Sequence, residues 1–581
     1  MTEREKMAEI AKRRKEWEEG TLRKSLERFG AIESPNRFYT PLDIEGHDFL
    51  EKVGFPGEYP FTTSIYPTNI PFQMMSAASG ASAAVVRAGN YSGYGTAEDT
   101  RDYHNFMATL GHRGGPNIAF DLPTQCGHDS DEPVSRGEVG KVGVAVDTLR
   151  DFETIYEAFQ GERDLDKIAS NFTINAPTNV IVAMYMALAE QRGIPIDKLR
   201  GTPQNDILKE FVARGTYIFP PGPSMRMTRD TITFCTRYMP LMNPISICGY
   251  HMREAGASAA QAIAFTFANG IAYVQLGVDA GLDVDEFMPR FTFLSMGGSM
   301  DFYLEIARAR AARRMWARIM RERFKAKNPR SWLMREPGGG AHVGRVDLTS
   351  QRPLNNLTRT IAGGIMSALS GGPSHPIVPY DEPLGLGHSL EAQQLVTDGG
   401  RILQLECKLN SVIDPFAGSY FMESLTDQVE EEAWDILHKI DDMGGAVAAI
   451  EKGFMQREVA RSAYDHQRKL ETGEKVMVGV NRFTGEQELE VNTQRLVEHP
   501  YDPKRRDDAE EKQLAKLAQV KRERDNEKVQ ASLARLTEAA KDEDTNLIPV
   551  ILESVKAYAS IGEICGVLRQ VFGEYQAYSG L

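Results

Sequence analysis

Short strand-like segments alternate with helical stretches through the middle of this chain, and this regular alternation limits the possible folds more than any other feature. Eight segments have the composition of short strands: GNYSGYG (89–95), NIAFDLP (117–123), SNFTIN (170–175), GTPQND (201–206), ISICGY (245–250), RFTFLS (290–295), HVGRVDL (342–348) and SHPIVPY (374–380). The sequences between them, such as DTLRDFETIYEAFQ, have the periodicity of amphipathic helices. Eight successive strand–helix units predict an α/β fold, and in particular a (βα)8 TIM barrel.

The parts of the chain on either side of the predicted barrel have a different pattern. Residues 1–84 comprise an N-terminal arm, which begins with the charged segment MTEREKMAEIAKRRKEWEEG, and a lead-in segment. We expect the arm to be helical, and either solvated or bound to a partner. Residues 401–581 have a helical pattern, and the mixed-charge run at 504–546 is typical of an exposed helix. The sequence therefore predicts three parts, with the barrel at residues 85–400 between the arm and a C-terminal helical and linker region.

The composition excludes several classes of protein. The chain has 581 residues, of which 41% are hydrophobic, and this is enough for a large core and more than one domain. A net charge of −14 without a basic stripe argues against nucleic-acid binding. The five cysteines form no CxxC pair, the N-terminus is charged, and no apolar run is long enough to span a membrane. We therefore expect a reduced cytoplasmic protein without a membrane segment or a structural metal.

The predicted strands carry polar side chains on the face that should point into the barrel. In SNFTIN, Asn171, Thr173 and Asn175 share one face, whereas Phe172 and Ile174 share the other. Helices cover the outside of such a barrel, so the apolar face should point outward and the polar face inward. Burying these polar groups without partners would cost about 1–3 kcal/mol each. Either a polar molecule threads the barrel, or the groups bond to one another or to water.

Several long motifs occur in this chain in a characteristic order. They are YSGYGTAEDT (91–100), AFDLPTQCGHDSD (119–131), GTPQNDILKEFVARGTYIFPPGPSMR (201–226), ISICGYHMREAGA (245–257), GLDVDEFMPRFTF (281–293), PLNNLTRT (353–360), VIDPFAGSYF (412–421) and AAIEKGF (448–454). The motifs resemble those of the adenosylcobalamin-dependent acyl-CoA mutases, the methylmalonyl-CoA mutase family, over residues 90–574. In that family the pantetheine arm of coenzyme A runs through a barrel lined by small polar side chains, in agreement with the face pattern above.

The resemblance implies an isomerase that uses adenosylcobalamin (coenzyme B12). In such enzymes an adenosyl radical removes a hydrogen from the substrate, and the carbonyl-CoA group then migrates to the adjacent carbon. A separate domain of the family binds cobalamin and supplies an Asp-x-His-x-x-Gly motif, but none of the eleven histidines here lies in that pattern. The resemblance therefore implies a large subunit that binds acyl-CoA and needs a small cobalamin-binding subunit. It implies a heterotetramer, with a G-protein chaperone as a possible further partner.

The resemblance also assigns roles to single residues. His251 matches the histidine that donates to the thioester carbonyl, and Tyr250 the tyrosine beside the adenosyl group, so both are predicted to be catalytic. The predicted CoA-binding residues are Gln204, Asn243, Arg290 and Thr292. The predicted cofactor-binding residues are Glu382, which matches a glutamate that binds the adenosyl ribose, Phe120, and His342, which replaces a glutamine of the family.

Arg214 and Tyr91 are also predicted to be catalytic, and Arg214 is predicted to bind the substrate. Methylmalonyl-type members of the family use an arginine at the position of Arg214 to pair with the free carboxylate of the substrate, and a tyrosine at the position of Tyr91. Relatives that act on isobutyryl-CoA or 2-hydroxyisobutyryl-CoA have glutamine in place of the arginine. The pair of residues predicts a substituted malonyl-CoA and succinyl-CoA as substrate and product. The other reading of Arg214 is a salt bridge on a helix surface.

Some segments depart from the family pattern. Residues 70–90 are longer than in relatives and consist mainly of Ala, Ser, Gly and Met, which leaves room for a larger ligand. Val378 and Gln125 replace an asparagine and a histidine, and Ala119 is not the aspartate expected in a 2-hydroxyisobutyryl enzyme. We therefore predict a substrate bulkier than methylmalonyl-CoA, such as an alkyl- or aryl-succinyl-CoA.

Three other functions stay open at this point. The first is a mutase for isobutyryl-CoA or 2-hydroxyisobutyryl-CoA. The second is a non-catalytic CoA-binding scaffold or chaperone-like partner that has kept the barrel. The third is an unrelated barrel enzyme such as an aldolase, which would need a Schiff-base lysine or a cluster of metal ligands at the strand ends, and the sequence indicates neither.

Overall fold

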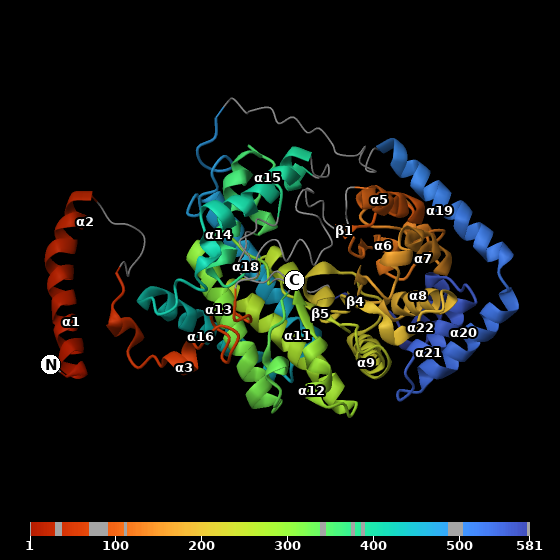
Figure 1. Ribbon diagram of the computed structural model, residues 1–581, viewed down its shortest axis with the longest axis horizontal. Helices are drawn as coiled ribbons and strands as arrows, with labels where there is room; N and C mark the ends of the chain where they lie inside the picture. Colours follow the sequence, from red (N-terminus) through yellow and green to blue (C-terminus); the bar gives the residue numbers. More distant parts are fainter. Residues whose placement is uncertain are drawn as a thin grey trace.

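A computed structural model of the chain describes residues 2–29, 38–68, 91–109, 113–294, 296–336, 344–372, 378–384, 390–485 and 503–577. It has an α/β architecture in which helices surround short parallel strands (Figure 1). The strands are β1 (Tyr91–Ser92), β2 (Asn117–Ala119), β3 (Ala169–Thr173), β4 (Arg200–Pro203), β5 (Ser246–Cys248) and β6 (Thr292–Leu294).

The strands follow one another in space in their sequence order. One parallel sheet has the order β1-β2-β3-β4, with Phe172 opposite Ile118, and β5 pairs with β6 in parallel. Two backbone hydrogen bonds of 2.9 Å link the two sheets: Asn243 N, before β5, donates to Gly201 O of β4, and Ser246 N, at the start of β5, donates to Gln204 O, directly after β4. The strands therefore form a continuous arc, which confirms the predicted α/β fold with parallel strands.

The last two predicted strands are not strands in the part of the chain that the structure describes, and no closed barrel is seen there. Residues 345–347 of HVGRVDL form a 3-10 turn, and the backbone of Arg335 lies beside β6, where it accepts a hydrogen bond from Phe293 N (2.7 Å). Of SHPIVPY, only 378–380 lie within the described residues, and they are not extended into a strand. Its two prolines cannot donate to a strand ladder, which explains the difference.

Helices cover the arc and extend beyond it at both ends of the chain. Those around the arc are α5 (Ala97–Thr109), α6 (Leu122–Gln125), α7 (Leu149–Ile155), α8 (Thr178–Gln191), α9 (Pro221–Tyr238), α10 (Tyr250–Glu254), α11 (Ala259–Asp279), α12 (Val284–Phe287), α13 (Phe302–Arg318), α14 (Asn355–Leu369) and α15 (Leu390–Arg401). The others are α1 (Glu3–Trp17), α2 (Arg23–Phe29), α3 (Phe49–Lys52), α16 (Tyr420–Asp442), α17 (Ala446–Glu451), α18 (Phe454–Glu471), α19 (Pro503–Glu523), α20 (Asn526–Lys541), α21 (Ile548–Lys556) and α22 (Ile561–Phe572).

The apolar faces of the strands point toward the helices, as their alternation predicts. The ring of Phe172 on β3 packs edge-on against Tyr185 of α8, with ring centroids 5.3 Å apart. On β6, Phe293 packs in the same way against Trp316 of α13, at 4.8 Å. All four side chains are buried in the main hydrophobic core. The opposite, polar faces of the strands therefore point to the inside of the arc.

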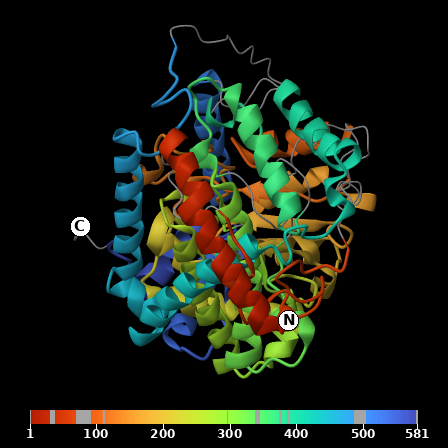
Figure 2. The ribbon, with the colours of Figure 1, turned by 90° about the vertical axis from the view of Figure 1, so that its left-hand side faces the viewer.

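Helix α1 lies at the left end of the long axis of the molecule, whereas the C-terminal helices α19 to α22 lie on the right-hand side (Figure 1). Helix α1 has no buried residues, and Arg14 ties it to Asp43 at 3.2 Å. After a quarter turn α1 crosses the near side of the molecule (Figure 2). Within the described residues, no helix combines the length and the apolar character that crossing a membrane requires.

Buried arginines on α13 attach α16 to the strand-bearing part of the chain. Arg310 donates to Glu423 (2.5 Å), and Arg314 donates through Nε to Glu430 (2.6 Å). Arg313 donates instead to the backbone carbonyls of Phe61 and Thr62, before the described part of the lead-in segment ends. The ion pairs of Arg310 and Arg314 join α13 to α16, two helices that are far apart in the sequence but side by side in the fold.

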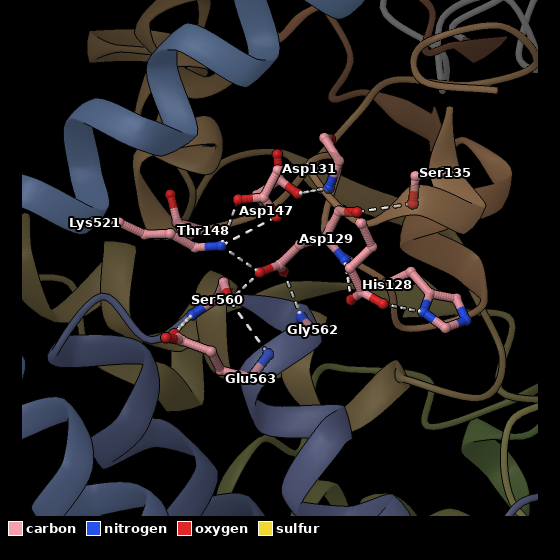
Figure 3. Close-up of polar contacts among 12 residues, drawn as sticks. His128, Asp129, Asp131, Ser135, Asp147, Thr148, Lys521, Ser560, Gly562 and Glu563 are labelled. Atoms are coloured by element: carbon pink, nitrogen blue, oxygen red, sulfur yellow. Dashed lines mark hydrogen bonds and ion pairs between the residues drawn. The ribbon is translucent and has the colours of Figure 1, made fainter. Parts of the chain in front are cut away.

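A buried carboxylate, Asp129, attaches the C-terminal helices on the other side of the molecule (Figure 3). Its two oxygens accept hydrogen bonds from Gly562 N (2.7 Å), Ser560 Oγ (2.6 Å) and Lys521 Nζ (3.0 Å). Nearby Asp147 is also buried, and burial and the neighbouring carboxylates raise its pKa well above the usual range, while Gln513 of α19 donates to it at 2.7 Å.

The mixed charges of α19 predicted an exposed helix, but one face of α19 is buried. Gln513 and Leu517 are fully buried, and Lys521 reaches inward to the buried acid. The expectation was wrong for this face of the helix because its charged residues have buried partners on a segment almost 400 residues earlier. The motif residues Cys126 and Gly127 take part in the same attachment, since their backbone carbonyls accept hydrogen bonds from Arg569.

Replacing Asp129 with alanine should loosen the C-terminal helices. Three donors would lose a buried acceptor, and we expect the free energy of unfolding to fall by about 2–4 kcal/mol. Urea unfolding measures this change, and hydrogen exchange of residues 503–577 locates it. Asp131→Ala is the matched control, because exposed Asp131 contacts the same Lys521, and should cost less than about 0.5 kcal/mol. Equal losses in the two variants would contradict this account.

Candidate functional site

Polar side chains gather where β4 ends. The chain turns sharply after Pro203, because Asn205 adopts a left-handed conformation (φ 53°) and its side-chain amide donates to the carbonyl of Pro244 (3.0 Å). This turn places Gln204 and Asp206, which flank Asn205, at the inner side of the arc, and both are buried. A short helical turn then leads into a π-helical turn, Glu210–Arg214, which ends at Gly215 with φ 87°.

A buried ion pair lies at the centre of this cluster. Lys209 Nζ lies 2.6 Å from Glu210 Oε1, and both side chains have no exposed surface. Lys209 also donates to Gln204 Oε1 (2.5 Å), and Asn175 at the end of β3 donates to Gln204 Oε1 (2.9 Å) and to Glu210 Oε1 (2.7 Å). Arg214 Nη1 approaches the same Glu210 oxygen at 3.4 Å. The ends of β3 and β4 and the π-helical turn therefore meet at one polar cluster.

The two carboxyl groups of the cluster titrate differently. Burial acts to raise the pKa of Glu210, but the charges of Lys209 and Arg214 outweigh it and hold the pKa below the usual range. Burial raises the pKa of Asp206 to about 6, although Lys209 opposes the shift. Asp206 accepts hydrogen bonds from the Tyr273 hydroxyl and from the backbone N–H of Cys248, both at 2.6 Å. Asp206 therefore connects the end of β4 to β5.

The end of β5 carries Tyr250 and His251, two of the residues predicted to be catalytic. Tyr250 and His251 form the first turn of α10, directly after Gly249, and their ring centroids lie 3.8 Å apart. A side chain at Gly249 would collide with Thr266 Oγ1, which a Cβ atom would meet at 2.5 Å. Helix α10 contacts the π-helical turn that ends at Arg214. The structure therefore brings His251 and Arg214 to the same region.

Asn243 lies deeper in the arc, on the segment that leads into β5. Its Nδ2 donates to Thr202 Oγ1 of β4 at 2.9 Å. Its Oδ1 is buried and has no hydrogen-bond partner among the described residues. The hydroxyl of Thr292 on β6 is satisfied differently, because it donates to the carbonyl of Ile245 (3.0 Å). The buried Oδ1 of Asn243 is thus an unused acceptor, whereas the Thr292 hydroxyl is already bonded to the backbone of Ile245.

Arginines gather at the opposite, amino-terminal ends of the strands. Arg290 is not part of β6, as was predicted, but ends a 3-10 turn before it, because Pro289 at the start of the turn cannot join a ladder. Burial lowers the pKa of Arg290, and the charges of Arg330 and Arg200 lower it further. Arg200 begins β4, and Arg335 also lies close enough for its pKa to be lowered by Arg290. These four like charges lie together without a described carboxylate partner.

The remaining predicted residues lie elsewhere or outside the description. Tyr91 forms β1 and pairs in register with Asn117, and its side chain is not described. His342 lies outside the described residues. Glu382 begins a 3-10 turn, Glu382–Leu384. Phe120 is fully buried and packs between the helix and strand residues Phe152 and Phe172; its role toward a cofactor stays a prediction.

Sequence reasoning did not single out Lys209, Glu210 and Asp206 at the centre of the cluster, although it placed Asn175 on a polar face that points inward. A Lys-Glu pair in a helix-like run is normally an exposed pair, and nothing local distinguishes this one. The available signal was the place of this pair in the apolar run ILKEFVA, which begins at Ile207, where charged side chains have no obvious solvent face.

Parallel strands wrapped by helices, with polar groups at their carboxyl ends, define an α/β protein. The chain matches the family model described as methylmalonyl-CoA mutase over residues 32–574. It belongs to the methylmalonyl-CoA mutase family, whose members are isomerases.

Two kinds of relatives are similar to this chain. It is 38% identical to the 2-hydroxyisobutanoyl-CoA mutase large subunit of Aquincola tertiaricarbonis, over 98% of both chains. It is 36% identical to the mitochondrial methylmalonyl-CoA mutase of Homo sapiens and 37% identical to methylmalonyl-CoA mutase of Rhizobium meliloti, but it covers only 66% of the length of each. The similarity along the whole chain favours the alternative prediction, a large subunit of the 2-hydroxyisobutyryl or isobutyryl type, over a methylmalonyl-type enzyme.

The raised pKa of Asp206 predicts how stability depends on pH. Its folded pKa, about 6, lies above the value of about 3.9 in an unfolded chain, so its contribution to stability is present at low pH and is lost as pH rises through 6. Relative to Asp206→Asn, the wild-type free energy of unfolding should therefore fall by about 1–2 kcal/mol between pH 5 and pH 7.5.

Urea unfolding of both proteins at several pH values measures this difference. The exposed position Asp435 provides a control, because Asp435→Asn should follow the wild type across the range. If the curves for wild type and Asp206→Asn stay parallel, burial does not control the titration of Asp206.

Proposed function

We propose that this chain is the large, acyl-CoA-binding subunit of an adenosylcobalamin-dependent mutase that moves a carbonyl-CoA group between adjacent carbon atoms. The observation that carries the proposal is the opposed chemistry of the two ends of the strands. Four arginines lie together at the amino ends, whereas Gln204, His251 and Arg214 lie at the carboxyl ends. A molecule with a polyphosphate at one end and a thioester at the other suits this arrangement.

The interior between these ends also suits the pantetheine arm of CoA. The buried Oδ1 of Asn243 lacks a partner among the described residues, and an orphaned buried acceptor costs about 1–3 kcal/mol. An amide N–H of pantetheine would satisfy it. The two-ended arrangement also supports the finer fold prediction, a closed (βα)8 barrel around the ligand, of which the described strands form one side. The predicted division at residues 84 and 400 belongs to the same proposal.

The cofactor and its carrier are part of the proposal. The first relative is a large subunit by name, which supports a partner, and we expect that partner to be a small cobalamin-binding subunit in a cytoplasmic heterotetramer. On this chain, Tyr250 would lie beside the adenosyl group and Glu382 would bind its ribose. The rings of Tyr250 and His251, tilted by 32° to each other, offer aromatic surface against which a nucleoside would pack. When bound, the cofactor supplies the radical that abstracts hydrogen from the substrate.

The residues of this chain would hold the substrate during that chemistry. His251 and Gln204 would donate hydrogen bonds to the thioester carbonyl oxygen and stabilise the negative charge that develops there as the group migrates. The buried lining of the site would exclude water and so protect the reactive species. The intact His251 and Gln204 argue against a non-catalytic scaffold.

The charge of the site favours an acyl group without a second carboxylate. The charged groups that act on Cys248 are Lys209, Asp206, Glu210 and Arg214, two cations and two acids. Their charges sum to zero when both acids are ionised, so no surplus positive charge requires an anionic substrate. We therefore propose a branched monocarboxylic acyl-CoA of the isobutyryl type. Ala119 lacks the carboxylate expected for a hydroxylated acyl group, which favours isobutyryl-CoA over 2-hydroxyisobutyryl-CoA.

A dicarboxylic substrate is the second candidate, and Arg214 is the observation that favours it. The guanidinium has one described contact, at 3.4 Å to Glu210, which leaves most of its donors for a substrate carboxylate. Residues 70–90, on which the prediction of a bulkier acyl group was based, lie outside the described residues.

Reconstitution tests the proposed activity. We expect the chain, mixed with a small cobalamin-binding subunit and adenosylcobalamin, to isomerise isobutyryl-CoA faster than methylmalonyl-CoA or benzylsuccinyl-CoA, measured by liquid chromatography of the CoA esters. Omission of the small subunit should abolish turnover, because this chain lacks the cobalt-binding motif. Turnover of the dicarboxylic esters alone would favour the second candidate, and absence of CoA-ester binding would contradict the proposed function.

Replacement of Arg214 by glutamine tests which acyl group the site prefers. The free carboxylate of methylmalonyl-CoA would lose its guanidinium partner in this variant, and such an interaction is worth about 1.5–3 kcal/mol. The ratio of kcat/KM for isobutyryl-CoA to that for methylmalonyl-CoA should therefore rise at least about tenfold. Arg237→Gln, at an exposed position near the end of α9, is the matched control and should leave the ratio unchanged. An unchanged ratio in Arg214→Gln would mean that Arg214 does not face the acyl end.

A further inference from the structure

The side-chain amide of Gln204 can present either an acceptor or a donor to the interior, and its surroundings decide which. Its Oε1 accepts two hydrogen bonds, from Lys209 Nζ at 2.5 Å and from Asn175 Nδ2 at 2.9 Å. Within the part of the chain that the structure describes, no hydrogen bond engages its Nε2. Rotating the amide by half a turn would place NH2 against two donors, which is strongly unfavourable.

The orientation of Asn175 is itself determined by the backbone. The N–H of Asp206 donates to Asn175 Oδ1 at 3.0 Å, so the NH2 group of Asn175 must point the other way. That group then donates to Gln204 Oε1 and to Glu210 Oε1. A backbone N–H is always a donor, so the N–H of Asp206 fixes the orientation of the Asn175 amide. The NH2 group of Asn175 in turn fixes the orientation of the Gln204 amide.

Lys209 imposes the same polarity independently. An ammonium group has only donors, so the atom that it contacts at 2.5 Å must be the Gln204 oxygen. The lysine is fully buried, and Glu210 at 2.6 Å provides the opposite charge that pairs with it there. Glu210 is in turn held by Thr216, whose backbone N–H and hydroxyl donate to Oε2 at 3.0 and 2.7 Å.

We infer that Lys209 is a positioning residue that holds the Gln204 amide with Nε2 toward the ligand, so that Gln204 donates to the thioester carbonyl oxygen of the acyl-CoA. This inference rests on the proposed function, and it adds which residue orients the amide of Gln204 as a donor. The site then has complementary groups at two levels, because Gln204 offers a donor near the thioester and Asn243 Oδ1 offers an acceptor in the interior. Lys209 acts only through Gln204 and does not touch the substrate.

Binding of two ligands that differ at one atom tests the inference. Isothermal titration calorimetry of the full-length chain would compare isobutyryl-CoA with S-isobutyl-CoA, a thioether that lacks the carbonyl oxygen. The variants are Gln204→Glu, Lys209→Met and Lys209→Arg. Gln204→Glu is the sharpest, because the carboxylate keeps the contacts of Lys209 and Asn175 but has no donor for the ligand.

We expect Gln204→Glu and Lys209→Met to weaken isobutyryl-CoA binding at least tenfold and S-isobutyl-CoA binding less than threefold. Lys209→Arg retains a donor-only cation and should recover part of the preference for the thioester. Thermal unfolding identifies any variant that does not fold, and Gln204→Glu alone is sufficient for the comparison.

Three results would overturn the inference, and each has a different meaning. If the variants weaken both ligands equally, the Lys209–Gln204 contact only supports the fold, and the proposed function survives. If the wild-type chain binds neither ligand, the proposed function fails and the inference fails with it. A wild type that binds both ligands equally well, with no effect of Gln204→Glu, would also show that Gln204 does not donate to the thioester.

Discussion

The buried ion pair between Lys209 and Glu210 is the interaction on which the polar interior depends. Two charges removed from water are tolerated only where hydrogen bonds satisfy their remaining atoms. Here Asn175 and Thr216 complete the carboxylate, and Gln204 accepts from the ammonium. The ends of two strands and the π-helical turn are therefore tied together at one point, and the groups proposed to meet the thioester inherit their geometry from it.

Other buried acid–base contacts hold the periphery of the molecule in the same way. Asp129 holds the C-terminal helices, and Arg310 and Arg314 of α13 hold α16. The strands are short, two to five residues each, so the sheet itself offers few ladder bonds to keep its surroundings in register. Ion pairs with fixed hydrogen-bond geometry supply the specificity that short strands lack.

Much of the strand arrangement could be predicted from the sequence because the signals are local. Alternating faces predicted that Phe172 and Phe293 point to the helices, and the structure confirms it. The prediction was wrong where composition misled it: SHPIVPY contains prolines that cannot complete a ladder, and Arg290 follows a proline that starts a tight turn. The family motifs located Gln204, Asn243 and His251, but no motif indicated what orients them.

By itself, the sequence determined the order of the parallel strands, the direction of their apolar faces and the family to which the chain belongs. These properties follow from periodicity and motif order, which are written in neighbouring residues. Only the tertiary structure decided which groups satisfy the buried charges, since the partners come from distant segments: Asp129 and Ser560 are 431 residues apart, and Asn175 and Gln204 follow different strands. A buried polar group must find a partner wherever the fold brings one, and no local pattern encodes that choice.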